Sequence, residues 1–124
     1  MTTEILTLPL PHKVLSPNAR PNRYAKTRAV KEARTLARRE AYRLSNEWDF
    51  PLGFVVTSIG YVAYWQTSRH KKDDTNLTGS CKAYEDGIQD AVRQDDSTWQ
   101  HEKPQHNVDD VNPRLEIHIN IQPL

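Results

Sequence analysis

The sequence has few of the residues on which many enzyme classes depend. It contains one cysteine, Cys81, five scattered histidines and four glycines. A single cysteine excludes an intramolecular disulfide, and its spacing to the histidines matches no zinc site. None of the glycines forms a G-x-G or P-loop arrangement, which excludes a phosphate-cradling loop of these types. We expect no small-molecule cofactor. These absences leave carboxylates as the main candidates for chemistry.

Long hydrophobic runs and a signal pattern are also missing. No apolar stretch approaches the roughly 20 residues of a membrane span, and the N-terminus lacks a basic segment followed by an apolar one. We therefore expect no membrane contact and a cytoplasmic protein. The pattern from His101 to His106 has one residue too many for a zinc-protease helix, and Pro104 would break that helix. We therefore do not interpret it as a metal site.

The two halves of the chain carry charge of opposite sign. The 124 residues have a net charge of +1, but residues 1–72 hold 13 Lys and Arg against 5 Asp and Glu, whereas residues 73–124 hold 4 against 11. A basic half that holds a phosphate backbone and an acidic half that binds metal would suit a nuclease. The same division would arise if the halves simply paired with each other.

The element pattern predicts one domain, residues 1–124, of the α+β class. A short strand at 4–9, a proline-rich loop, a helix at 23–45, a turn at 50–53 and a long strand at 54–65 with a possible bend at Gly60 come first. A second helix runs from about 77 to 92, and an outer strand at 97–103, a polar turn region at 104–113 and an alternating strand at 115–121 follow. This β-α-β-α-β-β order predicts two helices packed on a small mixed sheet.

The acidic stretch at residues 73–74 is the strongest candidate for chemistry. Asp73 and Asp74 stand where short polar side chains cap a helix, and apolar residues then recur at helical spacing. If the chain turns back after Val92, Asp96 approaches the start of this helix, and the carboxylates could hold a divalent ion such as Mg²⁺. The alternative is a capped helix with solvated acids at both ends.

The helix predicted at 23–45 carries a narrow stripe of alanine and leucine and many cations. Small residues allow close approach to a sheet or another helix, while the cations spread over a wide arc. They are candidates for phosphate contacts, although a solvated helix face would show the same composition. With the cations of the flanking segments, the candidate DNA-binding residues are Arg20, Arg23, Lys31, Arg34, Arg38, Arg69, Lys71 and Lys72.

Three blocks of the sequence resemble the RusA-type Holliday-junction resolvases, especially their phage-borne members. The first is Leu8-Pro9-Leu10-Pro11 with the loop at 15–20 and the basic helix. The second is the segment at 71–77, similar to the family's basic-D-x-D-N-L motif. The third is the run at 82–91 with Asp95-Asp96, similar to the family's K-x-x-x-D-G/A-hydrophobic run and its terminal D-D.

The resemblance implies a Mg²⁺-dependent homodimeric endonuclease that resolves four-way DNA junctions in recombination, repair or phage DNA processing. It places catalytic roles on Asp73, Asp96 and Lys82, with Asp74 as a substitute metal ligand, in the cytoplasm of a bacterial or phage-infected cell. Lys82 corresponds to the family's lysine in the phage-type spacing, whereas a match without a gap would place Gly79 there. The family's second aspartate is Thr75 in this chain, and the alternative is therefore a branched-DNA-binding protein of the same fold with weak or no catalysis.

Overall fold

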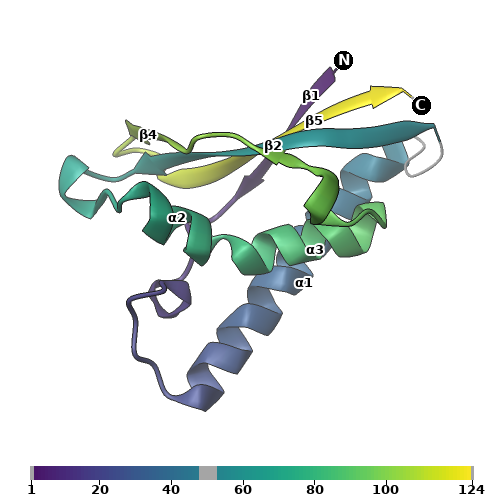
Figure 1. Cartoon of the computed structure of the whole chain (residues 1–124). Coiled ribbons are helices and arrows are strands. Elements are labelled where there is room, and N and C mark those ends of the chain that lie inside the picture. The colour runs from purple at the N-terminus through teal and green to yellow at the C-terminus, as the bar shows by residue number, and fades with distance from the viewer. Residues whose placement is uncertain (1, 48–52, 124) are drawn as a thin grey trace.

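A mixed sheet lies over a layer of helices that covers one of its faces (Figure 1). The computed structural model describes residues 2–47 and 53–123, which confirm the predicted α+β fold. The expected turn at 50–53 falls mostly on residues outside this described part. Three short 3-10 turns, at Lys13–Leu15 (η1), Ser68–His70 (η2) and Asp96–Thr98 (η3), connect the main elements. These main elements are β1 (Thr2–Leu8), α1 (Arg23–Glu47), β2 (Phe54–Trp65), α2 (Asp74–Ser80), α3 (Lys82–Val92), β3 (Gln100–His101), β4 (Gln105–Val108) and β5 (Arg114–Pro123).

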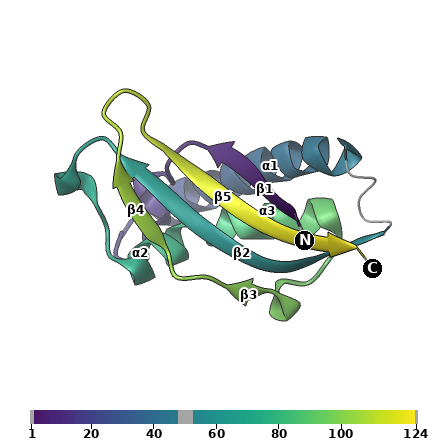
Figure 2. The same ribbon diagram turned by 90° about the horizontal axis from the view of Figure 1, so that it is seen from above.

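The strands follow the order β1-β5-β2-β3, and β4 pairs with β2 beyond the end of β3. Strand β5 is antiparallel to both β1 and β2, whereas β3 and β4 are parallel to β2 and form one interrupted edge (Figure 2). The prediction of a polar turn throughout 104–113 was wrong for β4. That strand is polar and mostly exposed, so it carries no hydrophobic alternation that would indicate a strand. The register of β2 against β5 shifts between Val56 and Ser58 rather than at Gly60.

The hydrophobic core lies between the sheet and the helices. Strand β5 alternates strictly between half-exposed and buried positions, which confirms the half-exposed strand expected at 115–121. Its side chains Leu115, Ile117, Ile119 and Ile121 face the core with at most 2% exposure. The alanine stripe of α1 packs closely, as its small residues predicted. Ala33, Ala37 and Ala41 are buried, and a Cβ atom on Gly87 of α3 would lie 3.0 Å from Ala37 Cβ.

The predicted second helix is divided into α2 and α3, which meet at Cys81. Its apolar positions Leu77, Cys81, Tyr84, Ile88 and Ala91 are all buried, as the helical spacing predicted. The division follows from local hydrogen bonding, because Ser80 Oγ donates to the Asn76 carbonyl at 2.8 Å, an interaction that bends helices. None of the described helices is long and apolar enough to cross a membrane.

Candidate functional site

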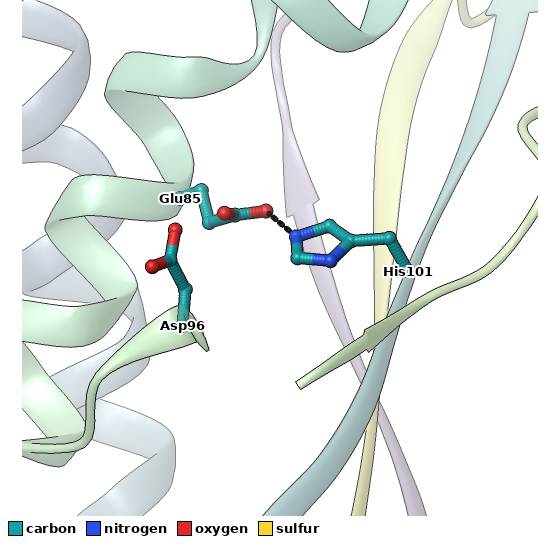
Figure 3. Close-up of side chains that lie close together, drawn as sticks. All are labelled: Glu85, Asp96 and His101. Carbon is teal, nitrogen blue, oxygen red and sulfur yellow. Dashed lines mark hydrogen bonds and ion pairs between the residues drawn. The ribbon is translucent and has the colours of Figure 1, made fainter. Parts of the chain in front are cut away.

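One group of side chains in the described residues has the composition and spacing of a metal site. It consists of Glu85 from α3, Asp96 from η3 and His101 from β3 (Figure 3). Each contributes one potential ligand atom, and these atoms lie within 4.8 Å of one another. The three residues come from separate elements, so the packing of α3 against the β2–β3 edge decides whether they meet.

Asp96 reaches this group because the chain reverses direction after α3. The helix ends at Val92, and Arg93 adopts a left-handed conformation with φ of 57°, which caps the helix and turns the backbone. The Asp96 backbone N–H then donates to Gln89 Oε1 at 3.2 Å. The expected return of the chain therefore occurs, and it places Asp96 beside the first half of α3.

Lys82 stands at the start of α3 and contacts two carboxylates. Its Nζ atom lies 3.1 Å from Asp96 Oδ2 and 3.2 Å from Asp86 Oδ1. The neighbouring carboxylates raise the pKa of Lys82 above its ordinary value, and partial burial works against them as the largest single effect. A positive charge is therefore held against the Asp96 carboxylate at neutral pH.

The strand register aims His101 at the helix layer. His101 pairs with Ile59 of β2, which is fully buried against the helices, whereas the next residue, Glu102, bonds Ser58 and Asn120. Successive strand residues face opposite sides of a sheet, so His101 turns toward α3. Its Nε2 atom lies 2.9 Å from Glu85 Oε1 (Figure 3).

Glu85 is a buried carboxyl group with polar partners on several sides. It is only 4% exposed, and its Oε1 atom accepts a hydrogen bond from the Tyr61 hydroxyl at 2.5 Å. Burial, followed by the hydrogen bond with Asp96, raises the pKa of Glu85 above the ordinary range. The same hydrogen bond, with help from Lys82, lowers the pKa of Asp96. The two carboxyl groups are therefore electrostatically coupled through the same contact.

Tyr61 fixes the orientation of Glu85 from the sheet side. Burial and the nearby Glu85 carboxyl raise the pKa of Tyr61 well above its ordinary value, so the phenol stays protonated and donates. Hydrogen bonds of this kind orient carboxylates that bind metals. Glu85 is thus positioned from both β2 and β3.

The predicted ligands Asp73 and Asp74 lie at the N-terminus of α2. They are not part of the group of Glu85, Asp96 and His101, called here the metal-like group, found among the described residues. Asp73 caps α2 by accepting a hydrogen bond from the Asn76 N–H at 2.7 Å, which confirms the predicted cap. Asp74 Oδ1 lies 2.7 Å from His106 Nε2. Thr75, the third of these positions, is exposed. Asp73, Asp74 and Asp96 are therefore not brought together as one three-aspartate set.

His106 is held in a defined tautomer beside Asp74. Its Nδ1 atom accepts a hydrogen bond from Trp65 Nε1 at 3.0 Å, and the two rings are stacked. Because an indole nitrogen can only donate, Nδ1 carries no proton and Nε2 donates to Asp74. His101 and His106, both on one edge of the sheet, thus each contact a carboxyl group of the helix layer, Glu85 and Asp74 respectively.

The proline-rich loop docks onto α2 and explains the glycine at position 79. Ser16 Oγ donates to Asn76 Oδ1 at 2.9 Å, and a Cβ atom on Gly79 would lie 2.4 Å from Pro17 Cγ. A lysine side chain at position 79 would therefore displace the loop. Lys82, by contrast, has room to contact Asp96.

The predicted DNA-binding cations lie in two separate regions. Within α1, Arg34 makes a two-pronged ion pair with Asp90 of α3, at 2.7 and 2.8 Å, and this pair raises the pKa of Arg34. One region is α1 with the segment just before it, and the other is the segment around η2, which projects at one end of the molecule (Figures 1 and 2). The remaining predicted cations are exposed except for half-buried Lys72; they are Arg20, Arg23, Lys31, Arg38, Arg69 and Lys71.

Comparison with known proteins gives a relative but no family. No family model matches the chain. The sequence is 38% identical over 95 residues, 73% of its length, to a protein of Xylella fastidiosa strain Temecula1 that bears the name "Uncharacterized protein". The match covers 59% of that relative, so the chain spans well under two thirds of its length. The name of this relative states no activity, and the functional argument therefore rests on the site.

Sequence reasoning found Asp96 and Lys82 but missed Glu85, His101 and Tyr61. A signal for Glu85 exists, because it lies between Tyr84 and Ile88 on the apolar side of its helix, where a charged residue is uncommon. His101 gave no such signal, since its direction depends on a two-residue strand. A parallel pairing with β2 is a long-range contact that no local pattern specifies.

Proposed function

We propose that this chain is a metal-dependent endonuclease that cuts four-way DNA junctions, with Mg²⁺ as the ion that the resemblance implies. The observation that carries the proposal is the return of Asp96 to Lys82 and Glu85 after α3. A carboxylate pair, a lysine and an imidazole on adjoining elements provide both metal ligands and a cation for phosphodiester hydrolysis. In this proposal the enzyme acts as a homodimer in the cytoplasm of a bacterial or phage-infected cell, in recombination, repair or phage DNA processing.

The residues of the site have distinct roles in this proposal. A divalent ion would supply polarisation of a phosphoryl oxygen and activation of water, and Asp96 is the predicted ligand that lies in the metal-like group. Lys82 is placed to stabilise negative charge that develops on the phosphate. Because Asp73 and Asp74 lie outside that group, their part is structural: Asp73 caps α2 and Asp74 bonds His106.

The exposed cations supply the affinity for DNA. Lys31 and Arg38 project from α1, and Arg69 and Lys71 lie in the segment before α2. Contacts of Lys and Arg with phosphates are independent of sequence and weaken with salt. A protein with two such regions suits a branched DNA, whose arms offer backbones in several directions.

One observation favours a second candidate, a protein that binds branched DNA with weak or no cleavage. Thr75 is neutral, Asp73 is occupied as a helix cap, and Asp74 bonds His106. A metal site built on the family's aspartates would then be incomplete. This candidate keeps the predicted DNA contacts and loses the incision.

A cleavage assay on a four-way junction tests both candidates. Purified protein is incubated with the junction and with a matched linear duplex, with and without Mg²⁺, and binding is measured in parallel in EDTA. We expect cutting of the junction alone, and only with the ion. Asp96→Asn should bind the junction and cut at least about 100-fold more slowly, since an amide contributes no charge. Asp110→Asn, at an exposed carboxylate in the loop before β5, is the matched control and should cut like the native protein.

The outcomes separate the candidates. Junction binding without incision, in Mg²⁺ and in other divalent ions, would contradict the enzyme and support the binding protein. Absence of salt-sensitive binding to any DNA would contradict both. Cutting by Asp96→Asn at the native rate would contradict the proposed site and would mean that the nuclease activity depends on other residues.

A further inference from the structure

We propose that Glu85, Asp96 and His101 are the metal ligands of this chain, and that the imidazole makes the centre select a first-row transition metal such as Mn²⁺ over Mg²⁺. The inference deepens the proposed function, because this ion would be the cofactor of the nuclease. Metal binding can nevertheless be measured without DNA. The ligand set differs from the three aspartates that the resemblance implies.

The geometry supports these three residues over the aspartates. Their potential ligand atoms lie within 4.8 Å of one another, and they converge from α3, η3 and β3 (Figure 3). Asp73 and Asp74 are instead directed to the α2 N-terminus and to His106. Glu85 and His101, rather than Asp73 and Asp74, are therefore the residues placed to bind an ion together with Asp96.

The charge arrangement around Asp96 favours a bound cation. The Glu85 and Asp96 carboxyl groups each offer one oxygen atom to the same group of ligand atoms, which lie within 4.8 Å of one another. Glu85 is 4% exposed, so water stabilises its negative charge poorly. Of the carboxyl groups of Glu85 and Asp96, Lys82 makes an ion pair with Asp96. A divalent ion would neutralise both carboxylates at once.

A second observation is the support that surrounds the ligands. The Tyr61 hydroxyl, itself 3% exposed, donates to Glu85, and Gln89 Oε1 accepts from the Asp96 backbone. Metal-binding carboxylates are commonly held by outer hydrogen bonds of this kind. The carboxyl group of Glu85 and the backbone of Asp96 are thus held in place by the protein alone.

The imidazole decides which ion fits best. Mg²⁺ prefers oxygen ligands and retains much of its water, whereas imidazole nitrogen suits first-row transition metals. Mn²⁺ accepts carboxylate oxygens and imidazole together. A set of two carboxylates and one imidazole therefore gains affinity for Mn²⁺ that it does not gain for Mg²⁺.

Titration with Mn²⁺ in the absence of DNA tests the proposal. EDTA-treated, dialysed protein is titrated with Mn²⁺, and the free ion is followed by electron paramagnetic resonance, with Mg²⁺ added as competitor. We expect one Mn²⁺ per chain, displaced by Mg²⁺ only in large excess. His101→Gln should weaken Mn²⁺ binding by about tenfold or more, since loss of even an outer partner costs that much. His118→Gln is the matched control, because His118 pairs with Glu116 and lies on the same strand face as Glu116 and Asn120, away from the core.

Spectroscopy of the loaded protein identifies the ligand directly. Electron spin-echo modulation from a directly bound ¹⁴N should appear in the Mn²⁺ complexes of native protein and His118→Gln, and should be absent from His101→Gln. Circular dichroism verifies that each variant is folded. Glu85→Gln is measured as a second variant and should lose most of the affinity.

Each result has a separate meaning for the metal centre and for the nuclease. Native protein that binds no Mn²⁺, or His101→Gln that binds it as tightly as native, overturns the metal centre. Binding with the expected ¹⁴N signal but without junction cleavage supports the metal centre and contradicts the nuclease. Cleavage in Mg²⁺ that is unchanged in His101→Gln, with no ¹⁴N signal in native protein, overturns the metal centre and leaves the nuclease intact.

Discussion

Glu85 occupies a helix position that would ordinarily be filled by an apolar side chain. Its neighbours on the buried side of α3 are Tyr84 and Ile88, and it is as buried as they are. Burying a carboxyl group is unfavourable unless it is hydrogen-bonded. Tyr61 and His101 provide those bonds from two strands. A negative charge buried at Glu85 is energetically unfavourable unless a cation neutralises it, and this is the physical reason to connect Glu85 with ion binding.

Replacement of Lys82 tests the electrostatic role of the cation beside Asp96. Lys82→Met keeps the length of the side chain and removes the charge, so we expect cleavage to fall by about 100-fold while junction binding changes little. The side chain is 61% exposed, and its loss should leave the fold unchanged. The measurement is the single-turnover rate on a saturated junction. Lys103→Met, at an exposed position between β3 and β4, is the control, and an equal loss in both variants would contradict a specific role.

Cys81 offers a probe of local stability at the junction of α2 and α3. It is fully buried, and burial followed by the nearby Glu85 raises the pKa of its thiol. Since the thiolate is the reactive form, we expect its reaction with a disulfide reagent to be at least about 100-fold slower in native protein than in urea. Fast reaction in native buffer would mean that α2 opens readily.

The packing of α1 on α3 determines where α3 and the turn that follows it stand. Gly87 lies at the closest approach, where a Cβ atom would come within 2.3 Å of the Arg34 carbonyl oxygen. The buried alanines of α1 permit this approach, and the Arg34–Asp90 pair lies beside it. The helix pair therefore supports the end of α3 from which the chain turns toward Asp96.

Gly87→Ala should reveal how tightly these helices pack. In an unconstrained helix the change would add about 1 kcal/mol of stability. Here the contact is with backbone atoms, so overpacking should prevail and lower the free energy of unfolding by about 1–3 kcal/mol. Urea denaturation followed by circular dichroism measures it. Ala37→Gly added to this variant should give no rescue, because the Arg34 carbonyl remains; a more stable Gly87→Ala would contradict the packing.

The cations of α1 should contribute unequally to DNA binding. Arg34 already bonds Asp90 through two nitrogens, whereas Lys31 and Arg38 project from the helix as exposed side chains. Neutralising Lys31 or Arg38 should lower the salt slope of junction affinity by about one for each phosphate that the variant no longer neutralises. Arg34→Gln should change it less. Fluorescence anisotropy at several salt concentrations measures the slopes, and equal slopes for all variants would contradict an α1 interface with DNA.

At the scale of the whole molecule, the helices occupy one face of the sheet and the metal-like group lies where that layer meets the β3 edge (Figures 2 and 3). The opposite face is polar, with Asn120 bonded to Thr3, Ser58 and Glu102. One chain offers one such group among its described residues. A four-way junction needs two coordinated incisions, so a second chain is required for symmetric resolution.

The proposed activity therefore predicts a two-fold symmetric dimer. At the concentrations used for cleavage, sedimentation velocity should show two chains of 14.4 kDa per particle, either in free protein or bound to one junction. A junction cut in paired strands by a particle that remains a monomer throughout would contradict symmetric resolution by two chains. A mixture of native and Asp96→Asn chains should then yield junctions nicked in a single strand.

The sequence alone determined the features that depend on neighbours along the chain. The cap by Asp73 was predictable because its side chain bonds a backbone N–H three residues ahead. The buried side of the second helical region and the alternation of β5 were predictable because periodicity reports which residues share a face. The bounds of β2 followed from its β-branched and aromatic composition.

Only the tertiary structure decided which chemical groups meet. Glu85, Asp96 and His101 are brought together by a backbone reversal at Arg93 and by a two-residue parallel pairing with β2. Strand β4 has no hydrophobic pattern of its own, and only its parallel pairing with β2 defines it as a strand. Contacts of this kind depend on the global fold, since a side chain carries no local record of its partner in a distant element. The sequence therefore indicated an acidic site, and the packing of α3 against the sheet edge decided its members.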